Sequence, residues 1–305
     1  MLLVGATGFV GAHLAEVAAG AGLRVVGAGR EASGEAPACD LLDPASVRAC
    51  VAAIKPDLVV NAAGSASVGR SWEQPGETFA VNVGGVLNLL EAVAQEAPAA
   101  YVLCLSSADV YGARDEAELP LAEDLEPRPL TPYGAGKAAM EVLCGQYGRG
   151  RGMRIGVVRA FNMIGPGQSA RFAVPGFASR IAAAEREGGE VELRLGNPAA
   201  QRDFVDVRDG ARALLELSRR ELSGTYNLCS GRGTAIAELV AELARSARVP
   251  VTARHDPELE RPADPPALVG SPERMLESTG VVAEIELRQS LADLLEEWRA
   301  RPASA

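Results

Sequence analysis

The chain has 305 residues, 48% of them hydrophobic, and its 30 Lys and Arg against 40 Asp and Glu give a formal net charge of −10. These values exclude a disordered chain and a small disulfide scaffold, and they provide no basic surface for nucleic acid. Five scattered cysteines without a CxxC pair predict reduced thiols and no metal site. Because no basic leader and no apolar run of roughly 20 residues is present, we expect a cytoplasmic protein with no membrane partner.

Short apolar runs alternate with segments of helical period in the first 165 residues. This alternation predicts βαβ units around a parallel sheet, and therefore an α/β fold. The expected strands are 2–4, 23–28, 58–61, 101–105 and 154–159, and the expected helices are 10–21, 44–54, 77–95 and 133–147.

The rhythm loosens after residue 165, where Gly165-Pro166-Gly167 interrupts the chain. The expected helices are then 174–187, 207–219, 236–247 and 287–299, and the expected strands are 191–195 and 225–229. We predict a smaller lobe whose elements are interleaved with late strands of the sheet. The expected division is 1–165 with about 202–230 in the main domain, and 166–201 with 231–305 in the lobe.

A glycine-rich turn, Gly5-Ala6-Thr7-Gly8-Phe9-Val10-Gly11, follows the first strand and opens the first helix. Backbone N–H groups at such a turn face a ready anion site, which favours a dinucleotide pyrophosphate over a plain turn. The spacing is GxxGxxG rather than GxGxxG. The cofactor residues predicted here are Gly5, Thr7, Gly8, Phe9, Val10 and Gly11.

The end of the second expected strand carries Arg30 where an NAD-preferring protein usually has an acidic residue on the ribose. Arg30 therefore favours the 2′-phosphate of NADP, although it is also explained as a solvated surface arginine. Asp40 and Leu41 are expected near the adenine. Ala62, Ala63 and Gly64 end the next strand, where the backbone has to pass close to a ligand.

Tyr133 and Lys137 are four residues apart on an expected helix, so both point from one face. An ammonium and a nicotinamide cation nearby favour the phenolate, so we expect the pKa of Tyr133 to fall from about 10. Such a tyrosine exchanges a proton with a carbonyl or carbinol oxygen. By itself, the YxxxK spacing occurs on many helices.

Serine hydroxyls follow directly after the strand expected at 101–105, in Ser106-Ser107-Ala108-Asp109-Val110-Tyr111-Gly112. Open α/β sheets bind ligands at this carboxyl end, so Ser107 is predicted to hold a substrate oxygen beside Tyr133. The simpler explanation is that these serines only complete a turn. The glycine turn, the serines and YxxxK in this order are far more specific than any one of them.

With these motifs the chain resembles an extended short-chain dehydrogenase/reductase of the nucleotide-sugar epimerase/dehydratase family. The resemblance covers essentially all of the chain and implies a Rossmann-type doubly wound parallel sheet with a smaller α/β substrate lobe. It implies that Ser107, Tyr133 and Lys137 are catalytic, that Lys137 binds the nicotinamide ribose, and that Asn82 and Ile164 also contact the cofactor. Family members usually form dimers through two helices, here 77–95 and 133–147.

Four segments of the second half narrow the resemblance: 159–168, 202–209, 226–231 and 261–264. Together they are similar to GDP-mannose 4,6-dehydratases and, more closely, to GDP-4-dehydro-6-deoxy-D-mannose reductases, which make GDP-D-rhamnose. The resemblance implies that Asn162, Arg202 and Arg261 contact the diphosphate and that Asp264 binds the ribose. Alternatively, Arg202 pairs with Asp203, Asp206 or Asp209, and Arg261 is a solvated charge.

The expected function is therefore NADP-dependent reduction of a nucleotide sugar, with NAD as the other cofactor. A dehydratase needs an additional acid or base, for which related enzymes have Glu two residues before the tyrosine of the VYG turn; here that residue is Asp109. A 4-epimerase with NAD uses the same three residues. A protein that only senses NADP needs no proton donor, so the intact set of Ser107, Tyr133 and Lys137 argues against that role.

Overall fold

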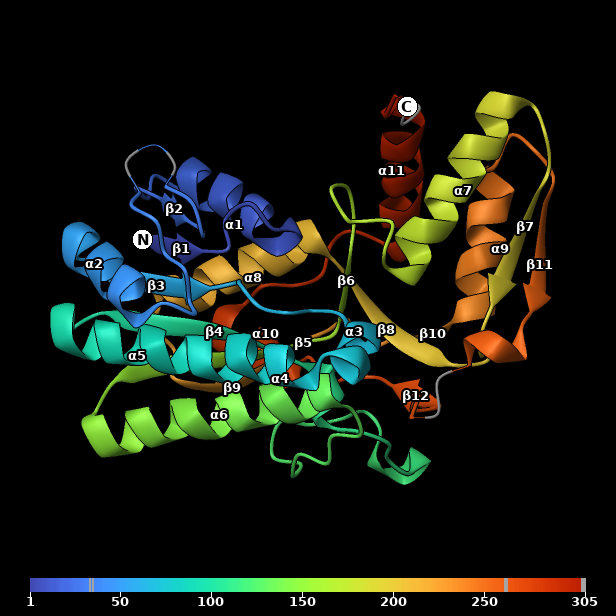
Figure 1. Ribbon diagram of the computed structural model, residues 1–305. Helices are drawn as coiled ribbons and strands as arrows, with labels where there is room; N and C mark the ends of the chain where they lie inside the picture. The colour runs from blue at the N-terminus through green and yellow to red at the C-terminus, as the bar shows by residue number, and fades with distance from the viewer. Residues whose placement is uncertain (33, 35, 261–262, 303–305) are drawn as a thin grey trace.

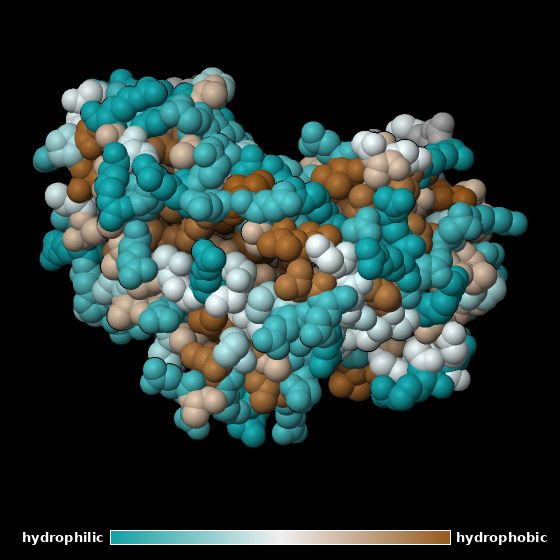
Figure 2. Space-filling model, turned by 180° about the vertical axis from the view of Figure 1, so that it is seen from behind, coloured by the Kyte–Doolittle hydropathy of each residue, from teal (hydrophilic) through white to brown (hydrophobic). Residues whose placement is uncertain are grey.

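The computed structural model describes residues 1–32, 34, 36–260 and 263–302. It has two parts, a doubly wound sheet and a smaller lobe on the right of Figure 1. Seen from behind, the surface is notched between these parts, and hydrophobic residues are visible in and below the notch (Figure 2). No helix within the described ranges is long and apolar enough to cross a membrane.

The main sheet has six parallel strands in the order β2-β1-β3-β4-β5-β9. The chain leaves β1 in one direction to β2 and in the other to β3, so the strand order reverses at β1, and ligands bind at such a reversal. The strands are β1 (Leu2–Val4), β2 (Val26–Ala28), β3 (Leu58–Asn61), β4 (Tyr101–Ser107), β5 (Arg154–Ala160) and β9 (Gly224–Leu228).

Helices cover both faces of this sheet because its strands are apolar on both sides. The core of one face contains α2 (Pro44–Ile54), α5 (Gly85–Glu96) and α6 (Pro132–Arg151). The core of the other contains α1 (Phe9–Gly20), α8 (Val207–Arg219) and α10 (Glu273–Thr279).

The lobe is built on three helices, α7 (Ala173–Glu187), α9 (Ile236–Ser246) and α11 (Leu287–Ala300), which share one apolar core with β7 (Val191–Leu195) and β8 (Gln201–Asp206). Strand β8 pairs with β6 (Asn162–Ile164), β10 (Gly233–Ala235) and β12 (Ala267–Leu268). Strand β7 pairs with β11 (Val251–His255).

The structure confirms the predicted fold class, and differs from the prediction in several elements. The strand expected at 23–28 is shorter, and β4 continues through Ser107. The helix expected at 77–95 is α4 (Pro75–Phe79), a π-helical turn η1 (Ala80–Gly84) and α5 in succession, preceded by α3 (Val68–Glu73). Strands β6, β8, β10, β11 and β12 and helix α10 were not predicted, because short runs that pair inside a lobe carry little periodicity of their own.

Candidate active site

The predicted glycine turn lies where β1 and β3 diverge. Gly5 has a φ of +85°, and a Cβ there would be 2.7 Å from the backbone nitrogen of Ala63. A Cβ on Gly11 would be 2.1 Å from the carbonyl oxygen of Gly5. The turn therefore needs glycine at both positions, since it packs backbone against backbone with the Ala62-Ala63 segment. Thr7 and Gly8 are exposed at the start of α1, with Phe9 and Val10 partly exposed behind them.

Hydrogen bonds place the other residues predicted to bind the adenosine half beside the end of β2. The amide of Cys39 donates to the carbonyl of Gly29 at 2.7 Å, next to the exposed Arg30. The Asp40 carboxylate accepts the amide of Leu42 at 3.0 Å. Leu41 is buried, and its carbonyl accepts from Asn88 at 2.8 Å, which ties this segment to α5.

Asn82 lies in the π-helical turn η1 and fixes the loop that follows β3. Its side-chain oxygen accepts from the amide of Ser65 at 2.9 Å and its nitrogen donates to the Ser65 carbonyl at 3.0 Å. A Cβ on Gly64 would be 2.9 Å from Asn82 Oδ1 and 3.5 Å from Lys137 Nζ. The structure thus brings Gly64, Asn82 and Lys137 together, and single π turns are frequent at functional sites.

Helix α6 begins immediately before Tyr133 because Thr131 caps it and Pro132 occupies its first turn. The Thr131 hydroxyl accepts the amide of Gly134 at 3.0 Å. A Cβ on Gly134 would be 2.7 Å from the carbonyl oxygen of Asp109, so only glycine lets the 3₁₀ turn η2 (Ala108–Val110) approach the helix this closely. The start of α6 and the end of β4 are brought into contact in this way.

Ser107, Tyr133 and Lys137 meet at this contact, with exposed fractions of 6%, 8% and 8%. Ser107 hydrogen-bonds with Tyr133 and donates to Asp109 Oδ2 at 2.9 Å. Lys137 Nζ donates to the carbonyl of Leu105 at 2.7 Å and lies 6.0 Å from the centre of the Tyr133 ring.

The expectation of a lowered tyrosine pKa is not met in this structure. Burial and then the Asp109 carboxylate raise the pKa of Tyr133 above its usual value, and the hydrogen bond with Ser107 only partly offsets them. Burial lowers the pKa of Lys137 to about 8. At neutral pH the tyrosine carries its proton and the lysine is charged, which is the state required to protonate an alkoxide.

Two of the predicted substrate residues pair with each other. Arg202 on β8 forms an ion pair with Asp264 at 2.6 Å, and Arg202 also donates to the carbonyl of Gln201 at 2.7 Å. Asn162 is exposed on β6, and its amide donates to the carbonyl of Asp203 at 3.0 Å. These three predicted residues therefore lie on or beside strands of one small sheet, while Arg261 lies outside the described residues.

The alternative partners considered for Arg202 are engaged elsewhere. Asp206 pairs with Arg208 at 2.8 Å and Asp209 pairs with Arg212 at 2.6 Å. Asp203 accepts hydrogen bonds from Ser230, Gly231 and Gly270, and burial raises its pKa.

Sequence reasoning gave His13 no role, yet it joins the two parts of the molecule. Its Nε2 donates to the carbonyl of Pro166 at 2.9 Å, and its ring packs edge-to-face on Phe9 at 5.7 Å. The next amide, that of Gly167, donates to Glu297 on α11 at 2.6 Å. No spacing in the sequence indicates this contact, because the residues are far apart in the chain. Ile164, just before this loop, is 1% exposed and packs into the lobe core.

The family model described as the NAD dependent epimerase/dehydratase family matches residues 1–229. The chain belongs to this family. This confirms the resemblance inferred from the motifs. Among curated relatives, GDP-6-deoxy-D-mannose reductase of Pseudomonas aeruginosa is 38% identical over 263 residues, 86% of each chain. GDP-6-deoxy-D-talose 4-dehydrogenase of Aggregatibacter actinomycetemcomitans is 31% identical over 79% of each chain.

Solved structures of the epimerase/dehydratase family give the same fold. RMD from Pseudomonas aeruginosa complexed with NADPH is 36% identical, with a TM-score of 0.88 over 99% of each chain. The UDP-glucose 4-epimerase of Thermus thermophilus in complex with NAD is 29% identical, with a TM-score of 0.86 over 98% of each chain.

Proposed function

We propose that the protein is a cytoplasmic NADPH-dependent reductase that converts the 4-keto group of GDP-4-dehydro-6-deoxy-D-mannose to the alcohol of GDP-D-rhamnose. The similarity to GDP-6-deoxy-D-mannose reductase over 86% of both chains carries this proposal. The gathering of Ser107, Tyr133 and Lys137 supports it, because reduction of a ketone needs one proton donor and one oxyanion partner.

The described residues fit a dinucleotide. The close-packed backbone at Gly5 and Gly11 leaves room for a pyrophosphate at the start of α1, where the helix dipole favours negative charge. Arg30, exposed beyond β2, supplies a cation for a 2′-phosphate. Asn82 and Lys137 beside Gly64 are placed to hold the nicotinamide ribose. When bound, NADPH supplies the hydride for C4 of the sugar.

In this proposal Tyr133 protonates the oxygen that becomes an alkoxide. Ser107 donates a hydrogen bond to the same oxygen, for which its hydroxyl turns away from Asp109. Lys137 places a positive charge near the phenol oxygen as the proton leaves, which stabilises the developing phenolate. A hydrogen bond from Lys137 to the ribose would keep the ring of the cofactor in register.

The diphosphate of the substrate is assigned to Arg202, Asn162 and Arg261, and a ribose hydroxyl to Asp264. The ion pair between Arg202 and Asp264 supports this assignment, because it orients a planar guanidinium at the edge of the lobe. The dinucleotide would lie on residues 1–165 with about 202–230, and the nucleotide sugar would contact 166–201 and 231–305.

Asp109 makes a 4,6-dehydratase the second candidate. Its carboxylate lies 2.9 Å from the Ser107 hydroxyl and interacts with Tyr133, so an additional base is present near the reacting groups. The same position is one methylene shorter than the glutamate expected for that reaction, which favours the reductase.

Purified protein given NADPH and GDP-4-dehydro-6-deoxy-D-mannose tests the proposal, with GDP-mannose plus NADP in parallel. We expect NADPH oxidation in the first mixture alone, with GDP-D-rhamnose as the product by NMR. A 4-keto-6-deoxy sugar formed in the second mixture without net change in cofactor would establish the dehydratase. Silence in both, together with turnover of a UDP-sugar with NAD, would establish the epimerase.

We also propose a homodimer through the exposed face of α4, α5 and α6. Phe79, Leu87 and Val142 on these helices are 39%, 39% and 70% exposed, which is unusual for large apolar side chains on helices of a monomer. Light scattering after size exclusion tests this state. A monomer mass at micromolar concentration would refute it.

A further inference from the structure

A buried ion pair lies beneath the three reacting residues. Arg159 on β5 forks onto Glu141 on α6, with Nη2 at 2.8 Å from Oε2 and Nε at 3.1 Å from Oε1. The two side chains are 5% and 9% exposed. Desolvating two charges is costly, and apolar residues of similar volume often stabilise a core as well or better. The pair therefore calls for a reason other than stability.

Glu141 joins the two elements that carry the reacting residues. It lies one helical turn beyond Lys137 on α6, and its Oε1 accepts the hydroxyl of Ser106 at 2.5 Å. Ser106 directly precedes Ser107 on β4. One carboxylate thus bonds the strand that ends in Ser107 to the helix that begins at Tyr133.

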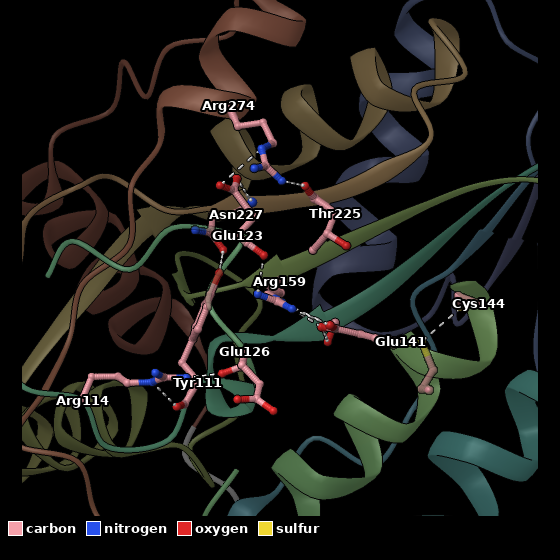
Figure 3. A network of polar contacts seen from close by, with 12 residues as sticks. Tyr111, Arg114, Glu123, Glu126, Glu141, Cys144, Arg159, Thr225, Asn227 and Arg274 are labelled. Atoms are coloured by element: carbon pink, nitrogen blue, oxygen red, sulfur yellow. Dashed lines mark hydrogen bonds and ion pairs between the residues drawn. The ribbon is translucent and has the colours of Figure 1, made fainter. Parts of the chain in front are cut away.

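Arg159 extends the same network to the turn after Ser107. Figure 3 shows Arg159 between Glu141 and the ring of Tyr111, whose centre is 4.7 Å from the guanidinium carbon. The Tyr111 hydroxyl donates to Asn227 at 2.7 Å, and Arg159 donates to the carbonyl of Glu123 at 3.2 Å. Every partner here is itself bonded, so the guanidinium has little freedom to move.

We propose that Glu141 is a positioning residue whose carboxylate, held by Arg159 and bonded to Ser106, fixes the distance between Ser107 and Tyr133. This inference rests on the proposed reduction. Displacing a reacting group by about 1 Å costs roughly 100-fold in rate, so loss of this bond acts on turnover and leaves the binding of NADPH unchanged.

Glu141→Gln tests the inference, with Glu185→Gln as its matched control. Glu185 accepts two hydrogen bonds from Arg299 at 2.6 and 2.5 Å and is equally buried, but it lies in the lobe between α7 and α11. Both variants are expected to lower the melting temperature. We expect Glu141→Gln alone to lower kcat by about 10- to 100-fold, with the KM for NADPH within about twofold of wild type.

Ser106→Ala removes only the bond to β4 and keeps the ion pair. We expect it to lower kcat as Glu141→Gln does while changing the melting temperature little. Ser218→Ala is its control, because the Ser218 hydroxyl is buried and donates to the carbonyl of Leu214 within α8. This variant is expected to keep the wild-type kcat.

Wild-type kcat in both Glu141→Gln and Ser106→Ala would overturn the inference, as would an equal loss in Glu185→Gln. An inactive wild type would instead contradict the proposed function. The geometric claim is then decided by crystal structures of wild type and Ser106→Ala, in which the distance between Ser107 Oγ and the Tyr133 hydroxyl is expected to differ. An unchanged distance would refute it.

Discussion

Replacing Gly11 by alanine tests whether the glycine turn is a cofactor site. The new Cβ would lie 2.1 Å from the carbonyl oxygen of Gly5 and 2.9 Å from the Cα of Ala6, both backbone atoms that cannot rotate away. The turn has to shift by about 1 Å to restore ordinary contact, and overpacking of this kind costs roughly 1–3 kcal/mol. If that cost falls on the bound state, NADPH affinity decreases by about 10- to 100-fold.

Gly20→Ala is the matched control, because it makes the same change at the other end of α1, where no heavy atom lies within 4 Å of the new Cβ. Alanine there gains up to about 1 kcal/mol of helix propensity and leaves the turn intact. NADPH fluorescence titration and thermal unfolding of both variants give the answer. An affinity of Gly11→Ala within about twofold of wild type would refute the assignment of this turn to the pyrophosphate.

Tyr133→Phe is expected to lower kcat by about 10²- to 10⁴-fold while the Kd of NADPH is retained; loss of binding in a titration would show a structural role instead. Because burial lowers the pKa of Lys137 to about 8, its ammonium is lost as the pH rises through that value, so kcat should fall above about pH 8, and a flat pH–rate profile would contradict this. His13→Ala removes one hydrogen bond and should raise the KM of a substrate up to about tenfold, whereas the exposed His255→Ala should not; equal KM values would show that the contact is dispensable. Arg30→Ala should lower the ratio of NADPH to NADH efficiency at least about tenfold, and an unchanged ratio in steady-state kinetics would place the 2′-phosphate elsewhere.

The sheet and its helices could be predicted because each element is long enough to show its period. The helix expected at 77–95 was located, but its π turn was not, since one extra residue in a turn leaves the apolar pattern almost intact. The strands of the lobe were missed for a different reason. Strand β8 is fixed by its pairing with β6, β10 and β12, which are far apart in the chain.

The candidate site was predictable where motif and local structure coincide, as for Ser107, Tyr133 and Lys137. Contacts formed by distant segments could not be read in this way. Arg202 pairs with Asp264 rather than with a neighbouring aspartate, and the pKa of Tyr133 is dominated by burial. Burial of a single side chain depends on the packing of the whole fold, which no short spacing reports.

The transfer of deuterium from 4-deuterated NADPH to GDP-4-dehydro-6-deoxy-D-mannose tests the central claim most directly. The account predicts one deuterium at C4 of the product, in the configuration of GDP-D-rhamnose, for each NADPH oxidised. A product without deuterium at C4, or turnover without oxidation of NADPH, would contradict it.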